Sequence, residues 1–453
     1  MGAHHSHRHD AGPTAPATVR AVLIVIVPLA VATLAALIWM WPSGTDGDET
    51  SAARLKKVTG EIVRIDLKPC PAQAPPVAEP GTPSPPGAPR PDPRRCGTAT
   101  VSLTSGPMAG RAVQTELPSG PGNRIFSAGE AVVLVEMPDA EGLPGSPGSP
   151  YQLSDHDRSG ALWIVALAFM LAVVAFGRWR GLTALVGLAI TFALILLFLI
   201  PAIIDGRPPL LAAIVCAAAI MLAVLYLTHG FTVTTSVAVM GTLASLTLTG
   251  VLAMAAIEMT RLTGIIDDSS LFLDIDYDIN TRGLLLASVI IGALGVLDDV
   301  TITQAATVRE LARANPSFGF GRLYRAATRV GRAHIASVIN TIVLAYAGAS
   351  LPLLLLFSLG RQPAGEVLTS PAVAQEIVRA VAGTIGLIAA VPLTTALAVF
   401  TATRRTPTDT DAVGVAEAPT RWPRSGRTAR NHASPLRESR SQDGGHQDGQ
   451  EQW

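Results

Sequence analysis

The stretch IIGALGVLDDVTITQAATVRE, residues 290–310, decides the fold class of this chain. It starts as an apolar run and then places two adjacent carboxylates, Asp298 and Asp299, before that run has ended. A carboxylate at the centre of a bilayer costs about 2.5–3.5 kcal/mol on an insertion scale, and such residues usually face a bundle interior or a wet cavity. The stretch therefore predicts a membrane helix whose acidic part is shielded from lipid.

The composition of the whole chain agrees with a membrane protein. Of its 453 residues, 49% are hydrophobic and only 15% are charged, which is unusual for a soluble enzyme. The formal net charge is zero, so no global field favours a nucleic-acid partner. Apolar runs long enough to cross a hydrocarbon core of about 30 Å predict eight spans, at about 20–41, 160–177, 181–203, 210–228, 231–257, 283–304, 333–357 and 380–402.

The first of these runs has two interpretations. It could be the apolar region of a signal peptide, or it could be a retained transmembrane anchor. Its length is close to 20 residues and it ends in Trp39 and Trp41, an aromatic belt that is typical of a retained helix. We expect it to remain in the protein.

The distribution of arginine predicts the orientation. The loop GRWRG at 177–181, the stretch 305–332, and the pair Arg404 and Arg405 are basic, whereas residues 258–282 are mostly acidic. Cytoplasmic loops carry an excess of Arg and Lys. Both termini are therefore expected in the cytoplasm, as tails at 1–19 and 403–453 of which the second is disordered.

This orientation places residues 43–155 outside the cytoplasm. Their apolar residues alternate with polar ones and are interrupted by Gly and Pro, which predicts a small antiparallel β-barrel or sandwich. A proline-rich insert at 69–95 is expected to be disordered. Cys70 and Cys96 bracket the insert, and they form either a disulfide in an oxidising compartment or two free thiols.

Polar residues of four predicted spans fall at one depth. By helical periodicity, Gly292, Gly295, Asp299, Thr303, Ala306 and Glu310 share one stripe, which should face protein, and Asp298 points about 100° away from Asp299. His334, Ser337, Thr341 and Gly348 form a second stripe, from which His334 could reach an aspartate. Other polar residues at this depth are Thr232, Thr234, Thr235, Ser236, Asn340, Thr394 and Thr395.

Two interpretations of this polar layer remain open. Hard oxygen ligands suit a proton or a small hard cation. Alternatively, the aspartates pair with Arg332 or His334 and hold the helices in register, while the threonines bond to their own helices. The residues predicted for an ion or substrate site are Asp298, Asp299, Thr303, Ser337, Asn340, Thr341, His334, Thr235 and Thr395. Close helix packing is expected at Gly292, Gly295 and Gly348, and no metal site or cofactor is expected.

Three ordered blocks carry a family resemblance. The segments IIGALGVLDDVTITQAATVREL, RVGRAHIASVINTIVLAYAGASLPLLLL and EIVRAVAGTIGLIAAVPLTTALA resemble the YibE/F-like family of bacterial multi-pass membrane proteins, in its actinobacterial form. The resemblance covers residues 160–402 well and the β region more loosely. It implies a plasma membrane protein with a seven-helix domain, an extracytoplasmic β domain and a transport or permease-like role without an agreed substrate. It brings no catalytic residues, and its motif positions are Gly292, Gly295, Asp299, Asn340 and Tyr346.

Two functions are therefore expected. The first is a transporter or permease whose polar layer binds a proton or cation. The second is a non-transporting scaffold, sensor or envelope assembly factor. An enzyme is not expected, because the sequence has no HExxH, GxSxG or P-loop and adjacent aspartates on one helix diverge. The expected partners are the lipid bilayer, a small ion or solute, and either a second copy of the chain or an envelope protein.

Overall fold

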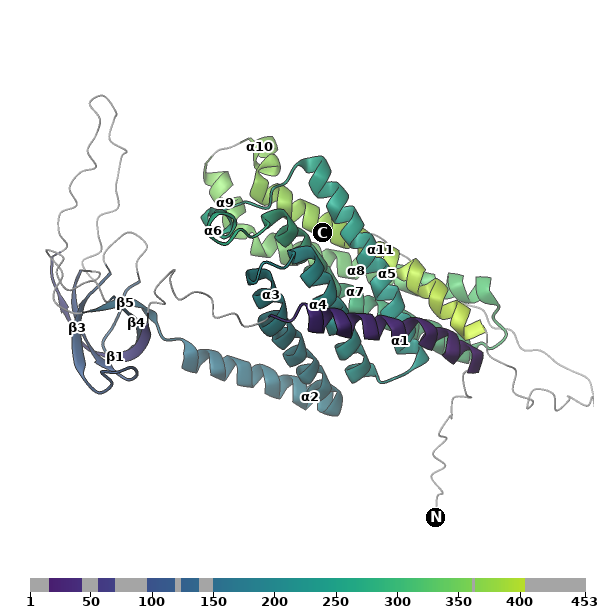
Figure 1. Cartoon of the computed structure of the whole chain (residues 1–453), viewed down its shortest axis with the longest axis horizontal. Helices are drawn as coiled ribbons and strands as arrows, with labels where there is room; N and C mark the ends of the chain where they lie inside the picture. The colour runs from purple at the N-terminus through teal and green to yellow at the C-terminus, as the bar shows by residue number, and fades with distance from the viewer. Residues whose placement is uncertain are drawn as a thin grey trace, which may run out of the picture. The chain divides into compact units, whose positions relative to one another are not determined.

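The computed structural model describes residues 16–42, 56–69, 96–118, 124–137, 150–360 and 363–403 (Figure 1). The predicted tails and the proline-rich insert lie almost entirely outside the described residues, as does Cys70. Cys96 is buried and disulfide-bonded, and its pairing with Cys70 stays a prediction. Cys216 is a buried free thiol.

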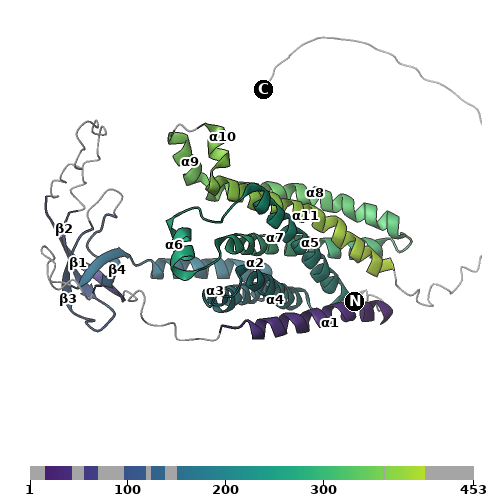
Figure 2. The same cartoon turned by 45° about the horizontal axis from the view of Figure 1, so that its top comes forward.

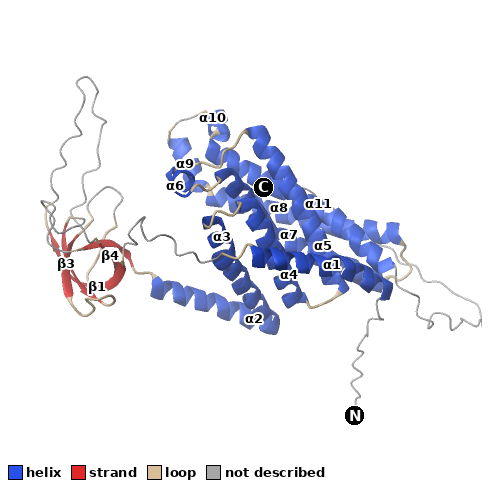
Figure 3. Ribbon diagram, in the orientation of Figure 1, coloured by secondary structure: helices blue, strands red, loops and turns tan. Residues whose placement is uncertain are grey.

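Seven helices in the described part of the chain are long and apolar enough to cross a membrane. Figure 3 separates them from the strands. They are α1 (Pro16–Trp39), α2 (Ser159–Leu194), which continues through the π-helix η3 (Ile195–Leu199) and α3 (Ile200–Ile204), then α4 (Pro209–His229), α5 (Val233–Thr260), α7 (Thr281–Ala314), α8 (Phe320–Ala349) and α11 (Pro371–Thr403). Shorter helices are α6 (Asp268–Tyr277), α9 (Leu351–Leu359) and α10 (Ala364–Thr369).

The predicted spans 160–177 and 181–203 lie within one helical run of 46 residues, Ser159–Ile204. The run is broken at Arg178, whose φ of 50° and ψ of −129° are not helical, and α2 turns sharply there (Figure 1). At Gly181 a Cβ atom would overlap the carbonyl oxygen of Val173, so only glycine permits this turn. The two predicted spans are therefore two segments on either side of a break.

The predicted span 333–357 is also divided. Helix α8 ends at Ala349, and α9 starts at Leu351. Pro352 explains the break, because it has no N–H to donate and its ring collides with the carbonyl of the residue four positions earlier. The seventh span therefore ends about eight residues before the predicted boundary.

The helical core forms around α5, α7 and α11, which pack on one another, while α4 packs on α7 and α8 packs on α11. Helix α11 lies beside α8 in both views (Figures 1 and 2). Buried residues include Val237, Leu297, Leu387 and Val391. Among the seven candidate spans, α7 is the most buried and α8 the least. Helix α7 is therefore the central element, and α8 exposes most of its surface.

The predicted β domain is confirmed as an antiparallel sheet between α1 and α2. Its five strands have the order β3-β2-β1-β4-β5 and form a half-barrel, because the two outer strands approach each other. Alternate side chains such as Val101, Leu134 and Leu153 fill its core, as strand periodicity requires. The strands are β1 (Lys57–Leu67), β2 (Gly97–Leu103), β3 (Ala112–Glu116), β4 (Ala131–Glu136) and β5 (Tyr151–His156).

Candidate functional site

Three hydrogen bonds align four helices in one polar layer. Thr242 Oγ1 on α5 lies 2.6 Å from Thr301 Oγ1 on α7. Gln304 Nε2 on α7 donates to the Ala327 carbonyl of α8 at 3.1 Å and to Thr395 Oγ1 of α11 at 2.7 Å. Polar groups of α5, α7, α8 and α11 therefore meet at one depth, although α8 contributes only a backbone carbonyl.

The residues at the centre of this layer differ from those expected. Thr395 was predicted, but Thr242, Thr301 and Gln304 were not, although all three of these are almost fully buried. Their polarity and helical spacing were the available signal: Thr301 and Gln304 lie three residues apart, on the face of α7 opposite to Asp299. This part of the layer is buried and internally bonded, so it clamps the helices together.

Close helix packing occurs at glycines other than those expected. A Cβ atom at Gly241 would overlap Thr394 Oγ1, and one at Gly386 would overlap Thr249 Oγ1. Gly331 similarly faces Gln304 Oε1. By contrast, Gly295 and Gly348 face open space. The only contact near Gly292 is the Tyr346 hydroxyl, 3.6 Å from a built Cβ. Gly187 of α2 is also buried, with a built Cβ 3.1 Å from Val224 of α4, so the close-packing glycines of the described helices include positions on α2, α5, α8 and α11.

The stripe of α7 that was expected to face protein is exposed. Gly292, Gly295, Asp299, Thr303 and Glu310 all lie on the open side of the helix. The expectation failed because polarity was taken to mean burial, whereas the widest buried face of α7 carries Leu297, Val300 and Gln304. Asp299 is nevertheless not isolated from polar groups, because it lies within electrostatic range of His229 of α4. Arg180 of α2 also lies within range of His229.

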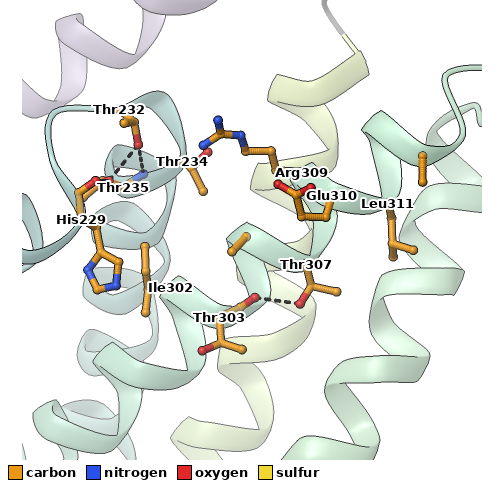
Figure 4. Close-up of a pocket in the computed structure, with 12 residues that line it drawn as sticks. His229, Thr232, Thr234, Thr235, Ile302, Thr303, Thr307, Arg309, Glu310 and Leu311 are labelled. Atoms are coloured by element: carbon orange, nitrogen blue, oxygen red, sulfur yellow. Dashed lines mark hydrogen bonds between the residues drawn. The ribbon is translucent and has the colours of Figure 1, made fainter. Parts of the chain in front are cut away.

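A pocket of about 690 Å³ lies at the end of this stripe, where α4 ends, α5 begins and α7 passes (Figure 4). Thr235 and Thr303, both predicted site residues, line it. Thr232 Oγ1 accepts a hydrogen bond from the Thr235 amide at 3.1 Å and thereby caps α5. The full lining is His229, Thr232, Thr234, Thr235, Ile302, Thr303, Ala306, Thr307, Arg309, Glu310, Leu311 and Ala314.

The pocket carries charge at one end. Arg309 extends toward the side where Thr234 lies (Figure 4). Glu310 accepts a hydrogen bond from Arg313 at 3.0 Å. At the other end of the pocket lie His229, Ile302 and Thr303 (Figure 4). The lining combines hydroxyl groups, an arginine, an imidazole and a carboxylate with a surface that is mostly apolar.

Asp298 lies four residues before Ile302, or about 6 Å along the helix axis. It is partly buried, and its Oδ1 atom is buried without a hydrogen-bond partner in the described chain. In the described chain, no basic group lies within 4.0 Å of either aspartate. The ion pairs expected with Arg332 or His334 are therefore not formed.

The predicted residues of α8 do not join the pocket. Ser337, Asn340 and Thr341 are exposed on the outer face of that helix, and Thr341 Oγ1 donates to the Ser337 carbonyl at 3.1 Å. His334 is partly buried, and its Nε2 atom is buried without a partner in the described residues. The structure thus brings Thr235 and Thr303 together with Asp298 and Asp299 one turn away, and it separates the α8 residues from them.

A second polar contact lies near the opposite end of α7 and was not expected from the sequence. Arg379 of α11 donates to Glu376 at 2.8 Å and to Ser288 Oγ of α7 at 3.2 Å. The side chains of Arg379 and Glu376 are 22% and 28% exposed. This cluster joins α7 to α11 at the end away from the pocket.

Seven long apolar helices, a pocket between three of them and an antiparallel half-barrel sheet define a multi-pass membrane protein with an added β domain. The YibE/F-like protein family matches residues 165–404, more than half of the chain, and the chain belongs to this family. No curated protein matches the chain, and neither does any solved structure. The match excludes the β sheet, which ends at His156.

Proposed function

We propose that the chain moves a small polar solute across the membrane, and that a proton or a small hard cation binds at Asp298 and Asp299 during transport. One observation carries this proposal: the pocket between α4, α5 and α7 ends one helical turn from a carboxylate oxygen that is buried without a partner. The proposal assigns no chemical step to any residue.

The environment of Asp298 favours a coupling role over a purely structural one. A buried acceptor without a partner costs free energy, and a charged carboxylate costs more. A proton or a cation at Oδ1 removes this cost, so the occupancy of Asp298 can be coupled to the packing of α7. A structural clasp would instead require a counter-charge, and the described chain supplies none within 4.0 Å.

The two ends of α7 also differ in a way that suits alternating access. One end borders the pocket, whereas Arg379 ties the other end to α11. Transporters of the secondary type expose a fixed site to one side at a time. The arrangement supports a conformation that is open at the pocket end and closed at the Arg379 end.

Purified protein in vesicles with an internal pH-sensitive dye tests the proposal. An imposed pH gradient drives protons inward. It is applied alone, and then together with an opposing sodium or potassium gradient. We expect Asp298→Asn to reduce ion movement to the level of protein-free vesicles, because the neutral amide keeps the shape and loses the charge. Glu366→Gln, in α10, is the matched control and should conduct as the native chain does. Equal ion movement by native and Asp298→Asn protein contradicts the proposal.

A scaffold function is the second candidate, and one observation favours it. Strand β1 exposes Val63 and Leu67, at 60% and 57%, and exposed apolar side chains on a sheet mark contact surfaces. Crosslinking in cells from cysteines at these positions should recover one stoichiometric envelope protein if the sheet recruits a partner. Recovery of no protein with several crosslinker lengths argues against this function.

A further inference from the structure

The first half of α8 carries a one-sided row of cations. Arg322, Arg325, Arg329 and Arg332 are all exposed. At 100° per residue they fall within about 80° of one another, over about 15 Å of helix. No Asp or Glu occurs anywhere in α8. We call these four residues the arginine row.

The arginine row keeps its charge available. In the described chain, none of the four guanidinium groups makes an ion pair within 4.0 Å. Arg325 donates one hydrogen bond, from Nε to the Gly321 carbonyl at 3.1 Å, and its terminal nitrogens remain for another ligand. Other arginines of the helical part do pair with acids, such as Arg313 with Glu310 and Arg379 with Glu376. Among the described helices, the absence of acidic partners for exposed arginines is therefore a feature of α8 and not of every helix.

The depth of the arginine row follows from contacts of α8 with α7. Ala327, in the middle of the row, accepts a hydrogen bond from Gln304, and Gln304 lies where the apolar run of α7 gives way to VREL. Farther along α8, the Tyr346 hydroxyl lies 3.6 Å from a Cβ built at Gly292, which is deep within that run. The arginine row thus straddles the boundary of the apolar layer, where lipid phosphates lie.

The second half of α8, beyond the arginine row, exposes apolar side chains. Val343 and Leu344 are 48% and 62% exposed, and α8 is the least buried of the candidate spans. A molecule that fits both parts has an anionic phosphate at one end and hydrocarbon chains at the other. Guanidinium groups bind phosphate oxygens in a bidentate manner, which an ammonium group cannot do.

We propose that the arginine row of α8 binds the headgroups of anionic phospholipids, with the acyl chains along the exposed apolar half of the same helix. The binding adds to the packing of α8, the least buried of the candidate spans, on α11 and α7. Because basic residues near a membrane surface gain energy from anionic lipid individually, loss of all four should weaken binding strongly. The proposal is independent of transport.

The test uses the full chain in detergent with dioleoyl phosphatidylglycerol or dioleoyl phosphatidylcholine. Bound lipid is counted by native mass spectrometry, and stability is followed by thermal unfolding. We expect phosphatidylglycerol, but not phosphatidylcholine, to bind and to raise the melting temperature. The variant with Arg322, Arg325, Arg329 and Arg332 all changed to Gln should lose at least about tenfold in affinity for phosphatidylglycerol.

Matched variants exclude general charge effects. Changing Lys56, Lys57, Lys68 and Arg111 to Gln removes four exposed cations from the sheet region and should leave lipid binding unchanged. If the fourfold Arg variant does not fold, the pair Arg325→Gln and Arg329→Gln gives the measurement. Equal binding by native and variant chains, equal effects of the two lipids, or full competition by millimolar inorganic phosphate would overturn the proposal.

Discussion

Two glycines of α11 differ in what surrounds them, and this difference predicts their response to substitution. A methyl group at Gly386 would overlap Thr249 Oγ1, whereas Gly383, three residues earlier on the same helix, has nothing within 4 Å of a built Cβ. Overpacking a well-packed helix contact costs about 1–3 kcal/mol. We expect Gly386→Ala to lower the melting temperature in detergent and Gly383→Ala to leave it unchanged or raise it slightly. Equal effects of the two substitutions would contradict the packing described here.

At the same scale, the sequence identified the aspartate pair but not the environment of each member. The 100° separation of Asp298 and Asp299 followed from helical geometry, and the structure places them accordingly, one partly buried and one exposed. Which of them faces inward could not follow from polarity, because the exposed stripe of α7 is as polar as its buried Thr301 and Gln304. Burial of those two residues depends on partners on α5, α8 and α11, which are distant in the sequence.

Asp155 allows a pH-dependent prediction at the scale of an element, strand β5. Hydrogen bonds from the guanidinium of Arg158 and then Arg124 lower the pKa of Asp155 to about 2. A carboxyl whose pKa is lower in the folded chain stabilises the fold above its unfolded pKa and loses this contribution as the pH falls through the folded value. We therefore expect the melting temperature to fall between about pH 4 and about pH 2, and to fall less in Asp155→Asn. Glu61→Gln, an exposed carboxyl of β1, serves as the control, and identical curves for native chain and Asp155→Asn would refute the assignment.

Element boundaries show why some features were predictable and others were not. Alternation of apolar residues predicted the sheet, because side chains of a strand alternate between core and solvent whatever the topology. The apolar runs predicted the long helices for a similar local reason. The break at Arg178 was also predicted, because the basic loop GRWRG separates two predicted spans there. The end of α8 at Ala349 was placed too late, because the apolar run continues past Pro352. The packing glycines depend on helix crossings, so only a known neighbour distinguishes Gly386 from Gly295.

The number of membrane crossings is the remaining whole-molecule question, and α2 decides it. The run Ser159–Ile204 has 46 residues, about 69 Å at 1.5 Å per residue, which is more than twice the hydrocarbon thickness. A single crossing would leave half of an apolar helix in water, whereas the break at Arg178 allows two crossings with Trp179 at the turn. We therefore predict that Trp179→Cys and Asp205→Cys are labelled by an impermeant maleimide from opposite sides of the membrane, with Trp179→Cys on the side of the termini. Labelling of both positions from one side would mean that α2 does not cross twice.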